Sequence, residues 1–484
     1  MKTFERTSLS LQGNPKRVLG RLFIPGEEEL INGNSRIPQV LHRALALNED
    51  VVVRALHAVE KQFESRHKDL KEQFDAHYRA VAHLVEEPIS DERKALIGAF
   101  FTQEYALEGA AYFNPSIVPF PGEIGDDPNI FRFILSVRAV GEGHISTIVF
   151  RTGFISGSGE IHVDPASPFA STEAKRFTTL RNRLVRHAAL EAGVDCADLD
   201  LVLAMLPHKF TPEDLMASLT QLDLAGMRHT PSDELVRVMD DIARSSYEID
   251  FPRESDLSER VLWPVTPDER RGMEDARFVM LVDEDEPVRY RASYTAYDGA
   301  SVNTRVLETN DFRSFYSMAM TGVAVKNKGL AFFPRRIDGG YCALSRYDRE
   351  SISLTFSSDG YHWNNVQPIL GAQQPWELVH MGNCGSPMEI DEGWLVLTHG
   401  AGPMRRYCIG ALLLDKSDPS KVIGRLSEPL IEPTEEERNG YVPNVVYSCG
   451  GIVHQGRLIL PYGVSDWRVR CSTVEVSEIL AALK

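Results

Sequence analysis

Apolar residues recur at helical spacing in two parts of the chain. In the first part, a spacing of three or four residues places on one helix face the side chains of Val52, Leu56, Val59 and Phe63. The same spacing predicts a second helix with apolar positions at Leu70, Phe74, Val81 and Leu84. A third helix, capped by Ser90, is predicted to carry Leu96, Phe100 and Phe101. Residues 1–109 are therefore predicted to form an N-terminal arm and a helical segment.

The second helical part spans residues 171–246. The segments Thr211-Pro212-Glu213-Asp214 and Thr230-Pro231-Ser232-Asp233 each place a capping threonine before a proline at the first helical position. Strand-like segments lie on both sides, so we interpret this part as a helical insertion. Each helical part carries an apolar stripe too large to stay exposed, and we expect residues 40–108 and 171–246 to pack together beside the β part.

Outside the helical parts, short strand-like runs alternate with polar turns. Examples are residues 116–118, 131–137 and 147–150, each bounded by Gly, Pro, Asn or Asp. A weak repeat relates Asp311-Phe312-Arg313-Ser314-Phe315 to Asp359-Gly360-Tyr361-His362-Trp363, 48 positions later. A period of about 40 to 50 residues in a β texture is typical of β-propeller blades, and the β part has room for roughly five or six.

Composition and charge limit the functional classes. The 484 residues are 43% hydrophobic and 25% charged, without an apolar run near the roughly 20 residues that a membrane-spanning helix needs. The first twelve residues lack the apolar region of a secretory signal, so we expect a cytoplasmic protein with no membrane role. The formal net charge of -17 disfavours nucleic acid as a partner, and an anionic substrate would need a local cluster of cations.

Cysteine spacing and glycine motifs point to no metal and no cofactor. The six cysteines are scattered without CxxC spacing and lie mostly in strand-like runs, so we interpret them as reduced core thiols. Neither a phosphate-loop fingerprint nor a dinucleotide fingerprint is present in the sequence. We therefore expect chemistry carried by side chains alone.

The strongest candidate for chemistry is the segment Arg271-Gly272-Met273-Glu274-Asp275-Ala276-Arg277. It places two acids just before the apolar run 277–282, which predicts a buried strand that holds them rigidly. On its own such a segment is more often a local ion pair. A propeller collects its ligand-binding residues from strands far apart in sequence, and the strand-like segments carry the polar candidates Asn114, Ser116, Arg138, Arg151, Lys328, Arg346, His380, His399, Asn444 and Asp466.

Several of these segments resemble motifs of glycoside hydrolase family 130, the mannoside phosphorylases and mannosidases, which fold as five-bladed β-propellers. Gly272-Met273-Glu274-Asp275-Ala276-Arg277 resembles the family's Gly-x-Glu-Asp-Pro-Arg motif, so the resemblance implies that Asp275 is the catalytic acid. Tyr294-Thr295-Ala296-Tyr297-Asp298-Gly299 resembles a further family segment. From these motifs and their neighbours we assign to substrate binding Asn114, Ser116, Arg138, Arg151, Glu274, Arg277, Tyr297, Asp298, Asn444 and Asp466.

A phosphate site is implied by the same resemblance. Lys328, Arg346 and His399 are similar to phosphate-binding residues of the family, and we add His380, which stands where phosphorylases usually carry a lysine. A histidine is charged only near or below its reference pKa of about 6.5, so we expect phosphate affinity to fall as the pH rises through neutrality. The other departure, Ala276 in place of the family's proline, removes no chemistry.

Together with the residue set, the resemblance implies an inverting phosphorylase that acts on β-mannosides and releases mannose 1-phosphate reversibly. Inverting hydrolysis needs two carboxylates, whereas phosphorolysis needs one acid and a set of cations, because phosphate is itself the nucleophile. Asp275 with Lys328, Arg346, His380 and His399 fits phosphorolysis. In the family the aspartate is thought to pass its proton through the sugar 3-hydroxyl, and the resemblance implies the same path here.

Two alternatives stay open. A β-mannosidase of the same fold would need a second carboxylate, for which Glu377 is the nominal candidate. A non-catalytic carbohydrate-binding propeller would keep Asn114, Arg138 and Asp466 but would not need a titrating Asp275. The products of an incubation with mannose 1-phosphate and a panel of acceptors would separate these functions.

The expected organisation has three parts. An N-terminal arm and helical segment occupies residues 1–109, a five-bladed catalytic propeller occupies residues 110–170 and 247–484, and a helical insertion occupies residues 171–246. The expected partners are a β-mannoside oligosaccharide and inorganic phosphate as the co-substrate, with no cofactor. We expect the helical parts to form an interface between copies of the chain or to roof the acceptor subsite.

Overall fold

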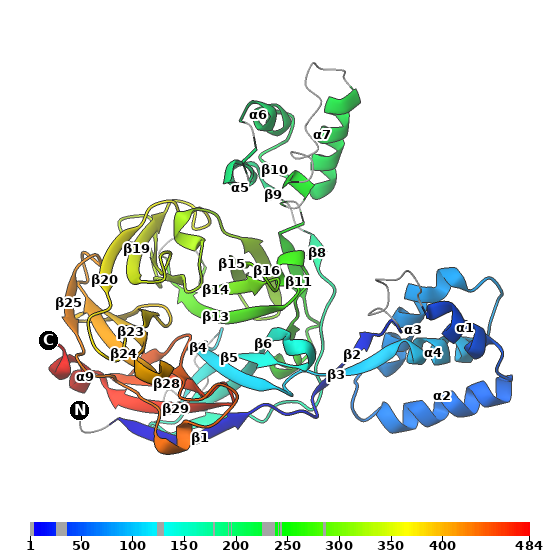
Figure 1. The fold of residues 1–484 in the computed structure, drawn as a ribbon, viewed down its shortest axis with the longest axis horizontal. Coiled ribbons are helices and arrows are strands. Elements are labelled where there is room, and N and C mark those ends of the chain that lie inside the picture. The colour runs from blue at the N-terminus through cyan, green and yellow to red at the C-terminus, as the bar shows by residue number, and fades with distance from the viewer. Residues whose placement is uncertain are drawn as a thin grey trace.

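The computed structural model describes residues 4–25, 36–122, 130–177, 180–191, 193–194, 196–224, 238–240, 242, 244–283 and 287–484. It shows a mainly β protein with two separate groups of helices (Figure 1). The described strands form an eleven-stranded sheet, two five-stranded sheets, a four-stranded sheet and two two-stranded ribbons. The strand-like runs at 116–118, 131–137 and 147–150 are confirmed, because they lie within β4 (Ala111–Pro119), β5 (Phe131–Val140) and β6 (Ser146–Ile155).

The eleven-stranded sheet consists of two antiparallel meanders. The first contains β4, β5 and β6, with β7 (Ile161–Val163) and β12 (Val261–Leu262) paired to β6. The second contains β13 (Gly272–Leu281), β14 (Arg289–Tyr297), β15 (Val302–Thr309), β16 (Ser314–Ala319) and β11 (Tyr247–Asp250), to which β8 (Arg176–Phe177) is added. A single parallel pair, Gly272 with Ser146, joins the two.

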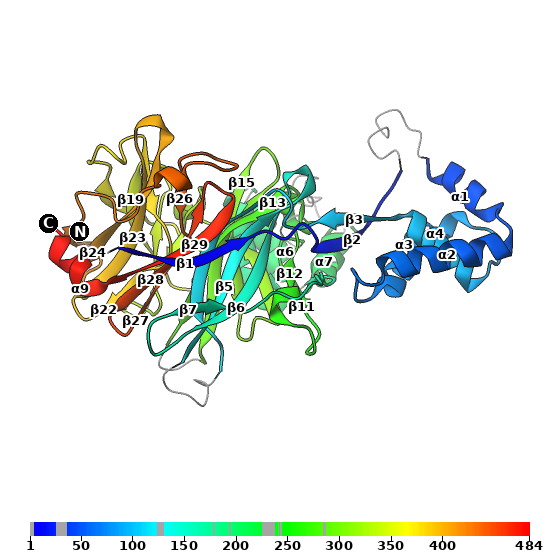
Figure 2. The same ribbon diagram turned by 90° about the horizontal axis from the view of Figure 1, so that it is seen from below.

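Three further meanders follow along the chain. The third meander contains β17 (Ala331–Phe332), β18 (Tyr341–Ser345), β19 (Ser351–Ser357) and β20 (Gln367–Gly371). The fourth contains β21 (His380–Asn383), β22 (Met388–Ile390), β23 (Gly393–Ala401), β24 (Tyr407–Leu414) and β25 (Val422–Arg425). The fifth contains β26 (Val446–Tyr447), β27 (Ile452–His454), β28 (Arg457–Val464) and β29 (Arg468–Glu475). The N-terminal strand β1 (Glu5–Gln12) completes the last one by pairing with β29 (Figure 2). The two ends of the chain are thus tied to one sheet.

The repeat seen in the sequence corresponds to a repeated turn. At Asp311 and at Asp359, the carboxylate Oδ1 accepts hydrogen bonds from the backbone N–H groups two and three residues later. Asp415 makes the same turn between β24 and β25. An aspartate that satisfies these N–H groups stabilises the reversal of the chain. The same local chemistry therefore connects the last two strands of three meanders.

The first helical part lies between the paired strands β2 (Val18–Leu22) and β3 (Thr102–Ala106). It contains α1 (Ile37–Leu45), α2 (Glu49–Phe63), α3 (Leu70–Val81) and α4 (Asp91–Phe100). The expected cap of the last helix is confirmed, because Ser90 Oγ accepts a hydrogen bond from Arg93 N at 3.2 Å. The expectation for Leu84 is wrong: α3 ends at Val81, and Leu84 is 43% exposed in the 3-10 turn that follows.

The second helical part contains α5 (Asn182–Glu191), α6 (Cys196–Ala204) and α7 (Pro212–Leu224), with the ribbon β9 (Leu180–Arg181) and β10 (Lys209–Phe210) at its base. The cap at Thr211 is confirmed by a 3.1 Å hydrogen bond from Asp214 N to Thr211 Oγ1. The cap expected at Thr230 lies outside the described residues.

The two helical parts do not pack together, which corrects our expectation. They lie on different sides of the β part in Figure 1. Each buries its apolar stripe in a small core of its own, formed in the first part by Leu41, Val52, Leu56, Leu70, Phe74, Leu96 and Ile97, and in the second by Val185, Leu199, Val202, Leu215 and Leu219. Because neither stripe remains exposed, neither part needs the other. Among the described residues, no helix is long and apolar enough to cross a membrane.

The contacts that hold β1 against the last meander can be tested by mutation. Arg6 donates hydrogen bonds to the carboxylate of Glu437, whose side chain is fully buried, and to the Glu432 carbonyl. Arg6→Ala is expected to lower the free energy of unfolding by about 2 kcal/mol, as is usual for hydrogen bonds to a charged group. Arg54→Ala, which removes an exposed pair with Asp50, should cost about 0.5 kcal/mol. Urea denaturation measures both, and equal losses would contradict the anchoring role.

Candidate active site

The backbone leaves regular strand geometry at Asn114 and Asp275. The pairing of β4 with β5 shifts between Phe113 and Ser116, and that of β13 with β14 shifts between Glu274 and Arg277. Asn114 and Asp275 adopt left-handed φ angles of 50° and 55° at these bulges. A bulge redirects a side chain out of the alternation of its strand. The two acids therefore lie inside the strand, not before it as we expected.

These two residues open onto a cavity of about 270 Å³. Eight of the candidates from the sequence line it, drawn from all five meanders or from the loops beside them: Asn114, Arg138, Asp275, Lys328, Arg346, His380, His399 and Asp466. The remaining lining residues are Phe113, Arg405, Tyr407, Val442, Val445 and Tyr447. The fold thus brings together side chains that lie up to several hundred positions apart.

Backbone strain concentrates around this cavity. Among the described residues, twelve non-glycine residues have a positive φ, and seven of them line the cavity or adjoin a lining residue: Asn114, Asp275, Met404, Arg405, Asn444, Ser465 and Asp466. Left-handed backbone is costly for residues with a side chain and persists where the surroundings enforce it. Its concentration here supports a functional role for the cavity.

Asp275 lies at the centre of a charged network. Its Oδ1 accepts hydrogen bonds from Asn114 Nδ2 at 2.6 Å and from Arg138 Nη1 at 3.1 Å. The neighbouring Glu274 accepts from Arg138 Nη2 and from Lys328 Nζ, both at 2.6 Å. Burial acts to raise the pKa of Asp275, but the positive charges of Arg138, Arg277 and Lys328 outweigh it and lower that pKa to about 2.

Asp466 is the second carboxylate of the cavity, and its environment acts in the opposite direction. Burial raises the pKa of Asp466 to about 7; the negative charge of Asp275 adds to this, while Arg138 and Arg405 oppose it. Two carboxyl groups whose pKa values are separated in this way are typical of catalytic sites. At neutral pH, Asp275 is ionised and Asp466 holds its proton part of the time.

The cavity lining also includes a group of cationic and aromatic residues. Arg346 Nη2 contacts the His380 ring, and the rings of His380 and His399 lie 5.4 Å apart. Gly382 makes room for this arginine, because a Cβ there would lie 2.1 Å from the Arg346 Cδ atom. Arg346 Nε and His399 Nδ1 are buried without a hydrogen-bond partner in the described structure. Both atoms belong to residues that line the cavity, and a buried polar atom without a partner calls for an explanation.

Burial, together with neighbouring positive charges, keeps both histidines neutral at physiological pH. Burial lowers the pKa of His380 to about 4, with Arg346 and Arg349 acting in the same direction. Burial also lowers the pKa of His399 well below its usual range, again with Arg346 contributing. Our expectation that His380 would gain and lose its charge near pH 6.5 is therefore not supported, because it ignored the buried arginine beside it.

Arg277 and Ser116 lie beneath the cavity. Arg277 is 1% exposed and donates hydrogen bonds to the carbonyls of Cys384 and Asp275 and to the Tyr447 hydroxyl, at 2.6, 2.9 and 2.7 Å. Ser116 Oγ accepts from Phe278 N at 3.1 Å. These contacts hold the two bulges, and neither Arg277 nor Ser116 is among the residues that line the cavity.

Four other candidates lie outside the cavity lining. Arg151 pairs with the buried Glu108 at 2.9 Å, and Asp298 accepts backbone N–H groups in its own turn. The Tyr297 hydroxyl donates to the Gly299 carbonyl, while its ring centroid lies 6.0 Å from Lys328 Nζ. Asn444 adjoins the lining residue Val445, and its carbonyl accepts from Tyr407 N at 3.0 Å. For Arg151 and Asp298, a direct contact with substrate is not supported by these positions.

Sequence reasoning missed Arg405, Tyr407 and Tyr447. Arg405 follows the Gly402-Pro403 turn and is next to a second arginine, Arg406. In an acidic protein, two adjacent cations at the end of a strand could have been recognised as candidates for binding an anion. Tyr447 lies three residues after Asn444 in a segment that we had already singled out. The Tyr407 ring is nearly parallel to that of His399, at 11°, a relation that the sequence does not contain.

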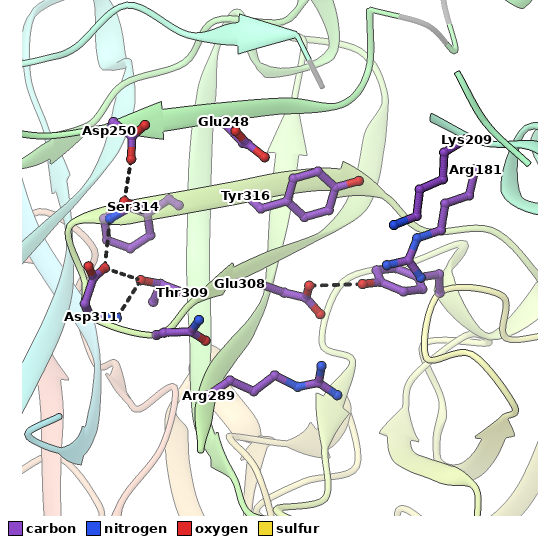
Figure 3. A pocket seen from close by; sticks show the side chains of 13 residues that line it. Arg181, Lys209, Glu248, Asp250, Arg289, Glu308, Thr309, Asp311, Ser314 and Tyr316 are labelled. Atoms are coloured by element: carbon purple, nitrogen blue, oxygen red, sulfur yellow. Dashed lines mark hydrogen bonds between the residues drawn. The ribbon is translucent and has the colours of Figure 1, made fainter. Parts of the chain in front are cut away.

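A larger cavity, of about 540 Å³, lies between the sheet and the ribbon of the helical insertion (Figure 3). None of the candidates from the sequence lines it. Two of its acidic residues are engaged locally: Asp250 accepts from Ser314, and Asp311 closes its own turn. Among the described residues, no group of three or more His, Cys, Asp or Glu side chains could hold a metal ion.

Comparison with known proteins identifies the family. Residues 231–484 match glycoside hydrolase family 130, described as beta-1,4-mannooligosaccharide phosphorylase. A 1,2-beta-oligomannan phosphorylase of Thermoanaerobacter sp. (strain X514) is 33% identical over 227 residues, which is 46% of this chain and 75% of the relative. A beta-1,2-mannobiose phosphorylase of Listeria innocua is 32% identical over 230 residues, 46% of this chain and 63% of the relative.

The solved structure of the Listeria innocua beta-1,2-mannobiose phosphorylase in complex with beta-1,2-mannobiose superposes with a TM-score of 0.45 and 21% identity, covering 82% of this chain and 95% of that one. The family match includes Asp275, Lys328, Arg346, His380, His399 and Asp466, while the strands that carry Asn114 and Arg138 precede it. With more than half of its residues matched, the chain belongs to glycoside hydrolase family 130, a family of mannoside phosphorylases.

Proposed function

We propose that this protein is an inverting phosphorylase that cleaves β-mannosides with inorganic phosphate and releases mannose 1-phosphate. The observation that carries the proposal is that one cavity is lined both by an acid and by a set of cations. Asp275, held by Asn114 and Arg138, lines it together with Lys328, Arg346 and the two histidines. A sugar bound in this cavity would meet the acid and the anion-binding cations together.

In this mechanism the cations hold phosphate against the anomeric carbon. Arg346 grips the anion through its planar fork of N–H groups, and Lys328 adds a second positive charge. Phosphate attacks the anomeric carbon, the glycosidic bond breaks, and the leaving oxygen receives the proton that Asp275 supplies, directly or through a sugar hydroxyl. Neither cofactor nor metal takes part in the proposed reaction.

The low pKa of Asp275 must rise for it to act as an acid. Arg138, Arg277 and Lys328 are the groups that lower it to about 2. A phosphate anion bound beside Lys328 offsets part of this positive charge, and a sugar excludes water from the carboxyl group; both changes raise the pKa. Phosphate binding and protonation of Asp275 are thus coupled in the proposed mechanism.

The fold supports this function through its meanders. We propose that the five meanders are the blades of a five-bladed β-propeller, in which β1 completes the last blade. Residues 1–109 then comprise that arm and the first helical segment, residues 110–170 and 247–484 form the catalytic domain, and residues 171–246 are an insertion. The arrangement explains how residues from every meander reach one cavity.

A β-mannosidase is the second candidate, because Asp466 places another carboxylate in the cavity. Inverting hydrolysis needs a base that activates water in addition to the acid. Glu377 does not suit that role: it is 1% exposed and accepts hydrogen bonds from Gln373 N, Gln374 N and Arg425. The dependence of the rate on phosphate separates the two functions.

Asp275→Asn tests the acid. The amide keeps the shape of the side chain but cannot supply a proton, so turnover should fall about 10²–10⁴-fold while the sugar still binds. Initial rates with mannose 1-phosphate and an acceptor measure turnover, and calorimetry measures binding. A variant with more than a tenth of the wild-type rate would move the acid to another residue, Glu274 first. A wild-type protein that binds sugar without any turnover would favour the carbohydrate-binding alternative.

Arg346→Ala tests the phosphate site. Loss of the guanidinium should raise KM for phosphate about tenfold or more, since hydrogen bonds to a charged group are removed. His380→Lys is the matched opposite change: it adds a permanent charge at the same wall and should lower KM for phosphate at both pH 6 and pH 8. Phosphorolysis rates against phosphate concentration give both values. A wild-type rate indifferent to phosphate would contradict phosphorolysis and leave the hydrolase.

Asp466→Asn tests the origin of the pH dependence. The pKa of Asp466 is about 7, so this carboxyl group is mostly protonated at pH 6 and mostly ionised at pH 8. Its negative charge should weaken phosphate binding as the pH rises, and the ratio of KM for phosphate at pH 8 to that at pH 6 should shrink in Asp466→Asn. His380→Lys should keep the wild-type ratio. The opposite pattern would assign the pH dependence to His380.

A further inference from the structure

A cavity of about 900 Å³ lies where the helical insertion meets one end of β14, β15 and β16. The insertion contributes Ala188 and Glu191 of α5, and the strand ends and their loops contribute Asp298, Asn303 and Lys326. This cavity is distinct from the one in Figure 3, which lies at the other end of β15. It is also more than three times as large as the candidate active-site cavity, of about 270 Å³.

The strand register places this cavity beside the candidate active site. Glu274 is opposite Thr295, which is opposite Thr304. Thr304 lines the large cavity and so lies two strands, roughly 10 Å, from Glu274. Thr304 Oγ1 also donates to the Asn327 carbonyl at 2.8 Å, and the next residue, Lys328, lines the active-site cavity. Only one short loop therefore separates the two cavities along this path.

The helical wall is held against the sheet by specific contacts. The Glu191 carboxylate accepts a hydrogen bond from the Gly322 N–H. The rings of His187 and His362 stack at 3.9 Å with an interplanar angle of 8°, and His362 Nδ1 lies 2.8 Å from Thr321 Oγ1. These contacts fix α5 as a wall of the cavity.

The lining suits a neutral polyhydroxylated ligand with apolar ring faces. Asn303 offers a donor and an acceptor and Lys326 offers donors, while Val302 and Met320 offer apolar surface. Pockets that enclose a whole ligand usually measure about 300–1,000 Å³. The candidate active-site cavity is smaller than this range, so the rest of an oligosaccharide must lie outside it, and the larger cavity nearby has the volume and the chemistry to bind it.

We propose that this cavity is a distal subsite for sugar units of a β-mannoside oligosaccharide that are remote from the cleaved bond. The inference rests on the proposed function for the identity of the sugar. The helical insertion then selects substrates by chain length, because α5 supplies one wall of the subsite.

Binding measurements without phosphate test the subsite separately from turnover. Calorimetry would compare mannobiose with mannotetraose, each in its β-1,2 and β-1,4 forms. The wild type should bind one tetraose about five- to tenfold more tightly than the corresponding biose, as one or two additional hydrogen bonds would give. Ala188→Trp, which fills the cavity from α5, and Asn303→Ala, which removes a polar side chain from its floor, should each reduce or abolish this difference.

Asn310→Ala is the matched control, because Asn310 is an exposed asparagine just beyond the opposite end of β15, in the cavity of Figure 3. It should leave the preference for the tetraose unchanged. Equal affinities for biose and tetraose in the wild type, or a tetraose affinity insensitive to both Ala188→Trp and Asn303→Ala, would overturn the subsite. Chain-length-dependent binding without phosphorolysis would support the subsite and contradict the proposed reaction, so the two failures are distinguishable.

Discussion

The candidate site depends on one buried guanidinium. Arg277 follows the bulge at Asp275 and donates its three hydrogen bonds to groups on three different segments, including Cys384 and Tyr447 from later meanders. Burial acts to lower its pKa, but Tyr447, Cys449 and Asp275 outweigh it and the pKa is raised, so the charge persists. A buried charge is tolerated only when its donors are satisfied. The bulge and the later meanders must therefore meet with the geometry seen here.

The charge of Arg277 also influences the pKa values of groups in the cavity. Arg277 with Arg138 and Lys328 keeps Asp275 ionised, and the negative charge of Asp275 in turn helps to raise the pKa of Asp466. In the same cavity, burial together with the charge of Arg346 lowers the pKa of His380 and keeps it neutral. Each titratable group thus has a pKa set by its neighbours and not by its residue type. A bound anion would change several of them together, which couples binding to proton transfer.

The two helical parts show how a large addition can leave this arrangement intact. Each has its own core and joins the β part through a two-stranded ribbon or a short connection, so the packing of the meanders does not depend on it. The helices of the first project to one side of the meanders (Figures 1 and 2), and Lys68 at their base pairs with Glu259 at 3.1 Å. The second meets the sheet beside the candidate active site, through His187 and Glu191 of α5. The position of the second part beside the site, and not the composition of its helices, relates it to the proposed function.

Local patterns in the sequence determined the elements. Apolar spacing identified the helices at Val52 and Leu70, the capping residues Ser90 and Thr211 marked their starts, and the aspartate turns at Asp311 and Asp359 marked the repeat. These features depend on contacts between residues that are close in the sequence, so they can be recognised without knowledge of the tertiary packing. The resemblance of the motifs to a family was likewise a property of short segments, and it identified eight residues of the cavity.

Only the tertiary structure decided how these residues act on one another. The neutral state of His380 depends on burial and on Arg346, 34 positions earlier, and the raised pKa of Asp466 depends on burial and on Asp275. The placement of Arg151 against Glu108 depends on the packing of the first meander. Burial and charge act through space with no fixed relation to sequence distance. The sequence could therefore name the residues of the site, while their protonation and pairing were set by the fold.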